Sequence, residues 1–160
     1  MNAFDMITYV QYNNWANERL VATAEQIPAN QLRTGALSKG NAFETLRHVL
    51  DVDWSWRMAC EEKPATDVSW ELEPLEDLAA VKAYWRNEGD YLLTLVRGWS
   101  EADFEREVTP SWQEKSAKIK HIVMHIVNHG TNHRSELGWY FTSLGYSPGD
   151  LDFMDYIATL

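Results

Sequence analysis

Residues that would cross-link this chain are almost absent from it. The 160-residue sequence holds one cysteine, Cys60, which excludes an internal disulfide bond and any metal site built from cysteine alone. Such sparing use of cysteine is typical of proteins from a reducing compartment. No histidine is spaced to activate this thiol, so we expect Cys60 to be a small buried residue and not a nucleophile.

Positive charge is also scarce. The chain has 14 lysines and arginines against 24 aspartates and glutamates, which gives a net charge of −10. A protein that binds a polyanion needs clustered Lys and Arg to displace counterions, and the nearest approach to a cluster is Lys115, Lys118 and Lys120. We therefore expect this protein to bind neither nucleic acid nor an anionic membrane surface.

Long apolar stretches are missing as well. No window reaches the roughly 18 apolar residues that a membrane-spanning helix needs. The first 14 residues, MNAFDMITYVQYNN, lack both the positive segment and the sustained apolar segment of a signal peptide. The sequence therefore predicts a cytoplasmic protein.

Apolar and aromatic residues, in contrast, are abundant. Hydrophobic residues make up 45% of the chain, which includes eight tryptophans. A chain of this length and composition can bury a substantial core, so we expect a single domain over residues 1–160. Apolar residues recur at three- and four-residue steps almost throughout, which predicts four long helices near residues 4–27, 41–63, 74–96 and 116–144. The expected fold is an all-α four-helix bundle.

Capping and helix-breaking residues define the predicted helix ends. Pro28 stops the first helix, and Asn41 with Glu44 three residues later forms a capping-box-like start for the second. Pro74 is placed as the first residue of the third helix, and Ser116 as the cap of the fourth. Residues 100–103 predict a short capped turn, residues 105–113 an extended loop or short strand, and the apolar tail after residue 148 packs back on the bundle.

Four of the five histidines lie in one predicted helix, each four residues after the last: His121, His125, His129 and His133. Four residues of α-helix turn by about 400°, so each histidine is rotated by roughly 40° and raised by roughly 6 Å from the one before. Neighbouring members can therefore converge on one point, whereas the first and last are about 120° apart. Only an adjacent pair can share a metal ion, and the spacing leaves open which pair does so.

The fifth histidine, His48, lies in the run TLRHVL of the second predicted helix, among apolar residues. With two histidines from the fourth helix it would complete a three-histidine site with open positions, which is the catalytic type of metal site. Neutral imidazole suits zinc, nickel, copper and ferrous iron. Such a metal lowers the pKa of its bound water or binds a substrate thiol as the thiolate. The competing interpretation is a polar seam of histidines that only packs.

Two familiar metal schemes are excluded. The run from His129 to His133 lacks the glutamate of the H-E-x-x-H motif, so a zinc protease of that type is not supported. Di-iron bundles need Glu-x-x-His motifs on two helices, whereas Glu44 and His48 are four residues apart and have no second copy.

Several segments in order resemble the DinB/YfiT-like family of metal-dependent enzymes, over essentially the whole chain. Residues 12–18 (YNNWANE) are similar to the family's Y-N-x-W-A-N-E segment, and residues 45–54 carry its T-L-x-H and acidic-aromatic segments. Residues 125–134 (HIVNHGTNHR) resemble its H-x-x-N-H-x-x-x-H-R run, and residues 144–152 its G-x-x-P and following aspartate.

This resemblance implies a bundle of up-down-down-up topology with a divalent metal held by His48, His129 and His133. His125 then has a supporting role, and His121 has none assigned. The family usually continues Gly-Gln after Arg134, whereas this chain has Ser135 and Glu136. Zinc or nickel is the first expectation for the metal, with iron or manganese as further choices.

Relatives that the resemblance brings in include transferases that use low-molecular-weight thiols such as bacillithiol, mycothiol or glutathione, and homodimers are common among them. We therefore expect a thiol-dependent transferase that acts on small electrophiles. A hydrolase at the same metal is one alternative, and a non-enzymatic metal sensor or store is the other. Arg134 and Glu136 are weak catalytic candidates. Trp15 and Trp54 are expected either to line the pocket or to belong to the core.

Overall fold

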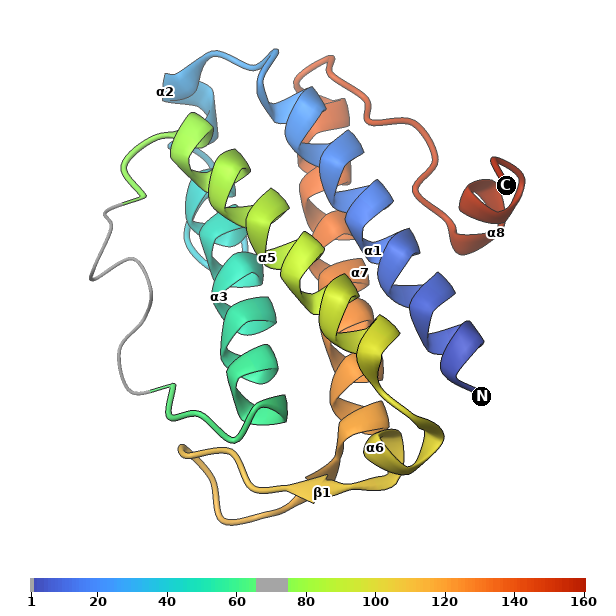
Figure 1. The fold of residues 1–160 in the computed structure, drawn as a ribbon. Coiled ribbons are helices and arrows are strands. Elements are labelled where there is room, and N and C mark those ends of the chain that lie inside the picture. The colour runs from blue at the N-terminus through green and yellow to red at the C-terminus, as the bar shows by residue number, and fades with distance from the viewer. Residues whose placement is uncertain (1, 66–74) are drawn as a thin grey trace.

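Four long helices account for most of the chain in the computed structural model, which describes residues 2–65 and 75–160 (Figure 1). The long helices are α1 (Ala3–Ala24), α3 (Ala42–Cys60), α5 (Leu78–Gly98) and α7 (Ile119–Ser143). Between and after them lie the short helices α2 (Ala29–Leu32), α6 (Glu101–Glu105) and α8 (Phe153–Ile157) and the strands β1 (Glu107–Val108) and β2 (Ala117–Lys118).

The long helices form a bundle in which α1 and α3 each contact both α5 and α7. In Figure 1, α1 and α7 run in one direction, and α3 and α5 run in the opposite direction. The predicted four-helix bundle with up-down-down-up topology is therefore confirmed. Because α3 and α7 are antiparallel neighbours, the middle of α3 faces the middle of α7. None of the helices within the described residues is long and apolar enough to cross a membrane.

Side chains cap three of the four long helices at their first residue. Asn2 and Asp5 form a full capping box on α1, and the side chain of Asn41 accepts a hydrogen bond from the backbone of Glu44 on α3. Asp77 caps α5, so in the described residues this helix begins at Leu78. The predicted start at Pro74 lies outside the described residues.

The prediction that Ser116 caps the fourth helix is wrong. The backbone of the next two residues, Ala117 and Lys118, pairs with β1 in a short antiparallel hairpin, so α7 begins only at Ile119. The hydroxyl of Ser116 instead bonds that of Thr109 at 3.0 Å across the hairpin. The expected strand in residues 105–113 is present as Glu107–Val108.

A belt of buried polar side chains separates two apolar clusters at mid-height in the bundle. On one side of the belt, Arg57 donates to both carboxylate oxygens of Glu88, at 2.5 and 2.9 Å. Next to this pair, the indole of Trp85 donates to Asp53 at 3.2 Å. On α7, the belt consists of Arg134, which has only 2% of its surface exposed. Buried charges need such partners, and the partners fix how the helices are rotated against one another.

Arg134 joins α7 to α1. Its Nη1 donates to the side-chain oxygens of Asn13 and Asn17 at 2.6 and 2.7 Å. The guanidinium lies across Gly130, where an added Cβ would sit 2.5 Å from Nη1 of Arg134 and 2.9 Å from Oδ1 of Asn13. A glycine one turn before Arg134 therefore leaves the room that this contact requires.

We expect Gly130→Ala to destabilise the protein by about 1–3 kcal/mol, because the added methyl group displaces the Arg134 guanidinium. Gly138→Ala on the same helix is the matched control, since its Cβ would meet only Pro148 at 3.4 Å. Alanine favours a helix over glycine by about 1 kcal/mol, so the control should be neutral or stabilised. Urea unfolding of both variants measures the difference, and equal midpoints would contradict the packing described here.

Candidate metal centre

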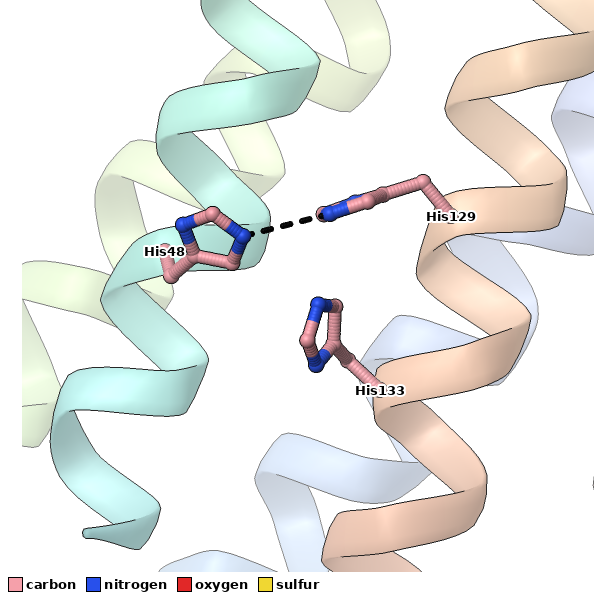
Figure 2. Close-up of side chains that lie close together, drawn as sticks. All are labelled: His48, His129 and His133. Atoms are coloured by element: carbon pink, nitrogen blue, oxygen red, sulfur yellow. Dashed lines mark hydrogen bonds between the residues drawn. The ribbon is translucent and has the colours of Figure 1, made fainter. Parts of the chain in front are cut away.

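Three histidines converge between α3 and α7 (Figure 2). His48 comes from the middle of α3, and His129 and His133 come from successive turns of α7. The Nε2 atoms of His48 and His129 are 3.2 Å apart, and the ring centroids of His129 and His133 are 4.6 Å apart. One nitrogen from each of the three rings lies within 4.8 Å of the other two.

Two of these rings, those of His48 and His129, are held in the neutral form. Burial lowers the pKa of His129 to about 3, with the positive charges of neighbouring groups, first His133, adding to the effect. The pKa of His48 is lowered to about 4, mainly by burial and secondly by the positive charge of Lys39. Neutral imidazole is the form that binds metal, so near neutral pH two of the three rings need no deprotonation.

The donor set fits a divalent metal ion. Three imidazoles at metal–nitrogen distances of about 2.0–2.1 Å around a tetrahedral ion would place their nitrogens about 3.3 Å apart, close to the 3.2 Å between His48 and His129. Within the described residues, the other ring nitrogen of His129, its buried Nδ1, has no hydrogen-bond partner. In the described residues the metal-ligating cluster contains these three histidines and no carboxylate.

Glu136 orients one of the three rings. Its Oε2 lies 3.2 Å from Nδ1 of His133, and its carboxylate also accepts from the backbone N–H and the hydroxyl of Ser38, at 2.5 and 2.7 Å. Partial burial raises the pKa of Glu136, but the bonds from Ser38 and the contact with His133 outweigh it, so the pKa lies below its ordinary value. A carboxylate on Nδ1 directs the other ring nitrogen of His133 toward the cluster.

The same carboxylate anchors a tight turn beside the site. Leu37 and Gly40 bond each other through both backbone groups, and Gly40 has a φ of +103°, which favours glycine. Between them, Lys39 borders a surface cavity that also involves His48 and Asp51. Burial raises the pKa of Asp51 above its ordinary value.

Neither Lys39 nor Asp51 was among the residues selected from the sequence. Asp51 was detectable, because it follows His48 by three residues and so shares its face of the helix. Lys39 was not, because its loop is placed by a hydrogen bond to a residue 98 positions away.

The remaining histidines of the α7 row lie outside the three-histidine cluster. The ring of His125 packs against that of Trp56 on α3 at 5.0 Å, and against that of His129 at 5.8 Å. His121, at the start of the helix, is exposed. The progressive rotation along α7 therefore divides the row into a half-buried pair that faces α3 and an exposed pair beyond it.

The other candidates from the sequence lie elsewhere in the bundle. Arg134 projects from α7 toward α1 and contacts asparagines there, away from the three rings. Trp54 is 8% exposed in the core, and Trp15 packs against Tyr156 of α8 with ring centroids 5.7 Å apart. Cys60 is buried, and burial raises the pKa of its thiol to about 12, so it is inert as a nucleophile, as predicted.

Fold and site together define the class: a four-helix bundle with a three-histidine cluster suited to a divalent metal. The sequence model of the DinB family matches residues 1–159, and the chain therefore belongs to the DinB family. Two proteins of Bacillus subtilis (strain 168) are related to it along most of their length. The protein named DinB is 24% identical over 164 residues, which cover 92% of this chain and 90% of that protein. YizA is 22% identical over 153 residues, which cover 93% and 94%.

Solved structures have the same fold. YfiT from Bacillus subtilis, described as "a probable metal-dependent hydrolase with an unusual four-helix bundle topology", has a TM-score of 0.70 at 15% identity, covering 87% of each chain. The DinB-like protein YjoA from Bacillus subtilis has a TM-score of 0.65 at 14% identity, covering 87% of this chain and 92% of that one. At these identities the likeness concerns the fold.

We expect the rings of His48 and His129 to stay neutral down to at least pH 5 in the metal-free protein, and to titrate near pH 4 and pH 3. NMR of the ring C–H signals between pH 8 and 3 measures both midpoints. In the unfolded chain the same rings titrate near 6.5, so it takes up protons at a pH where the folded rings do not. Their contribution to stability is therefore lost as the pH falls from 6.5 toward 4. Midpoints at or above 6.5 would contradict the neutral state of these two rings.

Proposed function

We propose that this protein is a metal-dependent enzyme whose metal is held by His48, His129 and His133, and that it hydrolyses a small electrophilic substrate. The convergence of three imidazoles on one point carries the proposal. Three protein ligands leave coordination positions open, as a catalytic site requires. The description of the structural neighbour YfiT as a metal-dependent hydrolase supports the choice of reaction.

A bound divalent ion would act here as a Lewis acid and make a water or thiol acidic near neutral pH. The protein groups around it have separate tasks. Glu136 holds His133 in one orientation, and Lys39 places a positive charge beside His48. Asp51 lines the same cavity and has a raised pKa, so it can accept the proton that the attacking water gives up.

Thiol transfer is the second candidate reaction. The cluster contains no carboxylate ligand, so the full positive charge of the metal is available to stabilise a thiolate. A thiol with an ordinary pKa of about 8.5 also needs less help from a base than water does. The native metal remains a choice between zinc and nickel first, and iron or manganese next. Homodimer formation stays a prediction.

We expect the protein to retain about one divalent ion per chain when it is purified without an affinity tag or chelator. His129→Ala should remove that metal, because two ligands remain of three. His121→Ala is the matched control from the same helix and should keep it. Mass spectrometry measures the metal content of the wild type and of both variants. A wild type without stoichiometric metal would contradict the proposal of a metal-dependent enzyme.

A panel of small esters, lactones and amides, run with and without low-molecular-weight thiols, distinguishes the two reactions. Hydrolysis without added thiol is the expected result, and Asp51→Asn should lower its rate by about 100-fold while metal content stays unchanged. Turnover that depends on an added thiol would show that the reaction is thiol transfer and not hydrolysis. A fully loaded protein that turns over neither panel would favour a metal sensor or store.

A further inference from the structure

A row of aromatic rings leads away from the three-histidine cluster between α3 and α7. His125 lies one turn before His129, and its ring contacts that of His129 with centroids 5.8 Å apart. From α3, the ring of Trp56 meets that of His125 with centroids 5.0 Å apart. Trp112, from the loop between β1 and β2, meets Trp56 at 5.2 Å. Three separate segments of the chain thus bring their rings together beside the cluster.

The periodicity of the two helices places this row next to the site. His48 and Trp56 are eight residues apart on α3. Trp56 therefore lies about 12 Å along the helix axis and a little over two turns beyond His48. On α7, His125 is one turn from His129. Since the two helices are antiparallel, moving from His48 toward Trp56 follows the same direction as moving from His129 toward His125.

These rings are not a closed core. Trp112 is 43% exposed, Trp56 is partly exposed, and His125 is exposed. The loop that carries Trp112 is held in place by the bond between Thr109 and Ser116 and by a bond from the Gln113 side chain to the backbone of Lys115. Trp112 thus presents a large apolar ring at the surface, joined to the cluster through Trp56 and His125, and such a ring is suited to contact a ligand.

The ring geometry indicates the kind of group. The neighbouring rings meet edge to face, with interplanar angles of 65° for Trp56 with His125 and 81° for Trp56 with Trp112. An uncharged aromatic ring gains both apolar burial and edge-to-face contact on such a surface.

We propose that His125, Trp56 and Trp112 form an aromatic subsite that recognises an uncharged planar ring of the substrate, adjacent to the reacting group at the three-histidine site. The inference rests on the proposed metal-dependent function and adds the substrate class: small electrophiles that bear an aromatic group. It also gives His125 a role in substrate binding, distinct from metal binding.

Two hydroxamates test the subsite on the zinc-loaded protein. Propionohydroxamate and 3-phenylpropionohydroxamate share a metal-binding group and a chain length, and only the second carries a ring. We expect the phenyl compound to bind about tenfold more tightly by isothermal titration calorimetry, because the ring buries apolar surface. Trp56→Leu and Trp112→Leu should abolish the preference without changing the affinity of propionohydroxamate, and Trp56→Phe should keep most of it.

Trp139→Leu is the matched control, because Trp139 lies on α7 beyond the cluster and is 75% exposed. It should keep the preference of the wild type. Trp112 lies in a loop, so its variant tests the subsite even if Trp56→Leu fails to fold. Equal affinities in the wild type, or a preference that survives Trp112→Leu, would overturn the subsite alone. If neither compound binds, the proposed function fails, and the subsite fails with it.

Discussion

The contact between Arg134 and the asparagines of α1 is the constraint on which the site depends. Arg134 follows His133 directly, so the two side chains leave α7 about 100° apart. Once the guanidinium is buried against Asn13 and Asn17, the rotation of α7 is fixed, and His133 must face α3. A buried arginine tolerates little movement, because losing its partners leaves an uncompensated charge in the core. The geometry of the three-histidine cluster therefore depends on a contact made by a different face of α7.

Much of the fold follows from local sequence features. The three- and four-residue recurrence of apolar residues predicted all four long helices, and residues such as Asn41 and Ser100 cap helices where the sequence places them. The prediction for Ser116 failed because the backbone after it pairs with a strand ten residues earlier in the chain. Helix capping is a local property, whereas pairing between strands depends on how the chain turns back.

The site was predictable to a different degree. Helix geometry reduced the four histidines of α7 to adjacent pairs, and the family resemblance chose His129 and His133. The structure brings these two together with His48. It also shows contacts that residue spacing does not predict. Glu136 contacts both His133 and the turn that carries Lys39. Trp112 contacts Trp56 from a distant loop. These contacts join segments far apart in sequence, and no periodic pattern records them.

The central claim is that three imidazoles, and no other side chain, bind the metal. X-ray absorption at the zinc edge of the loaded protein tests it most directly. The account predicts three imidazole nitrogens at about 2.0–2.1 Å, with the remaining positions filled by oxygen atoms. A sulfur neighbour at about 2.3 Å, or fewer than three imidazoles, would contradict it.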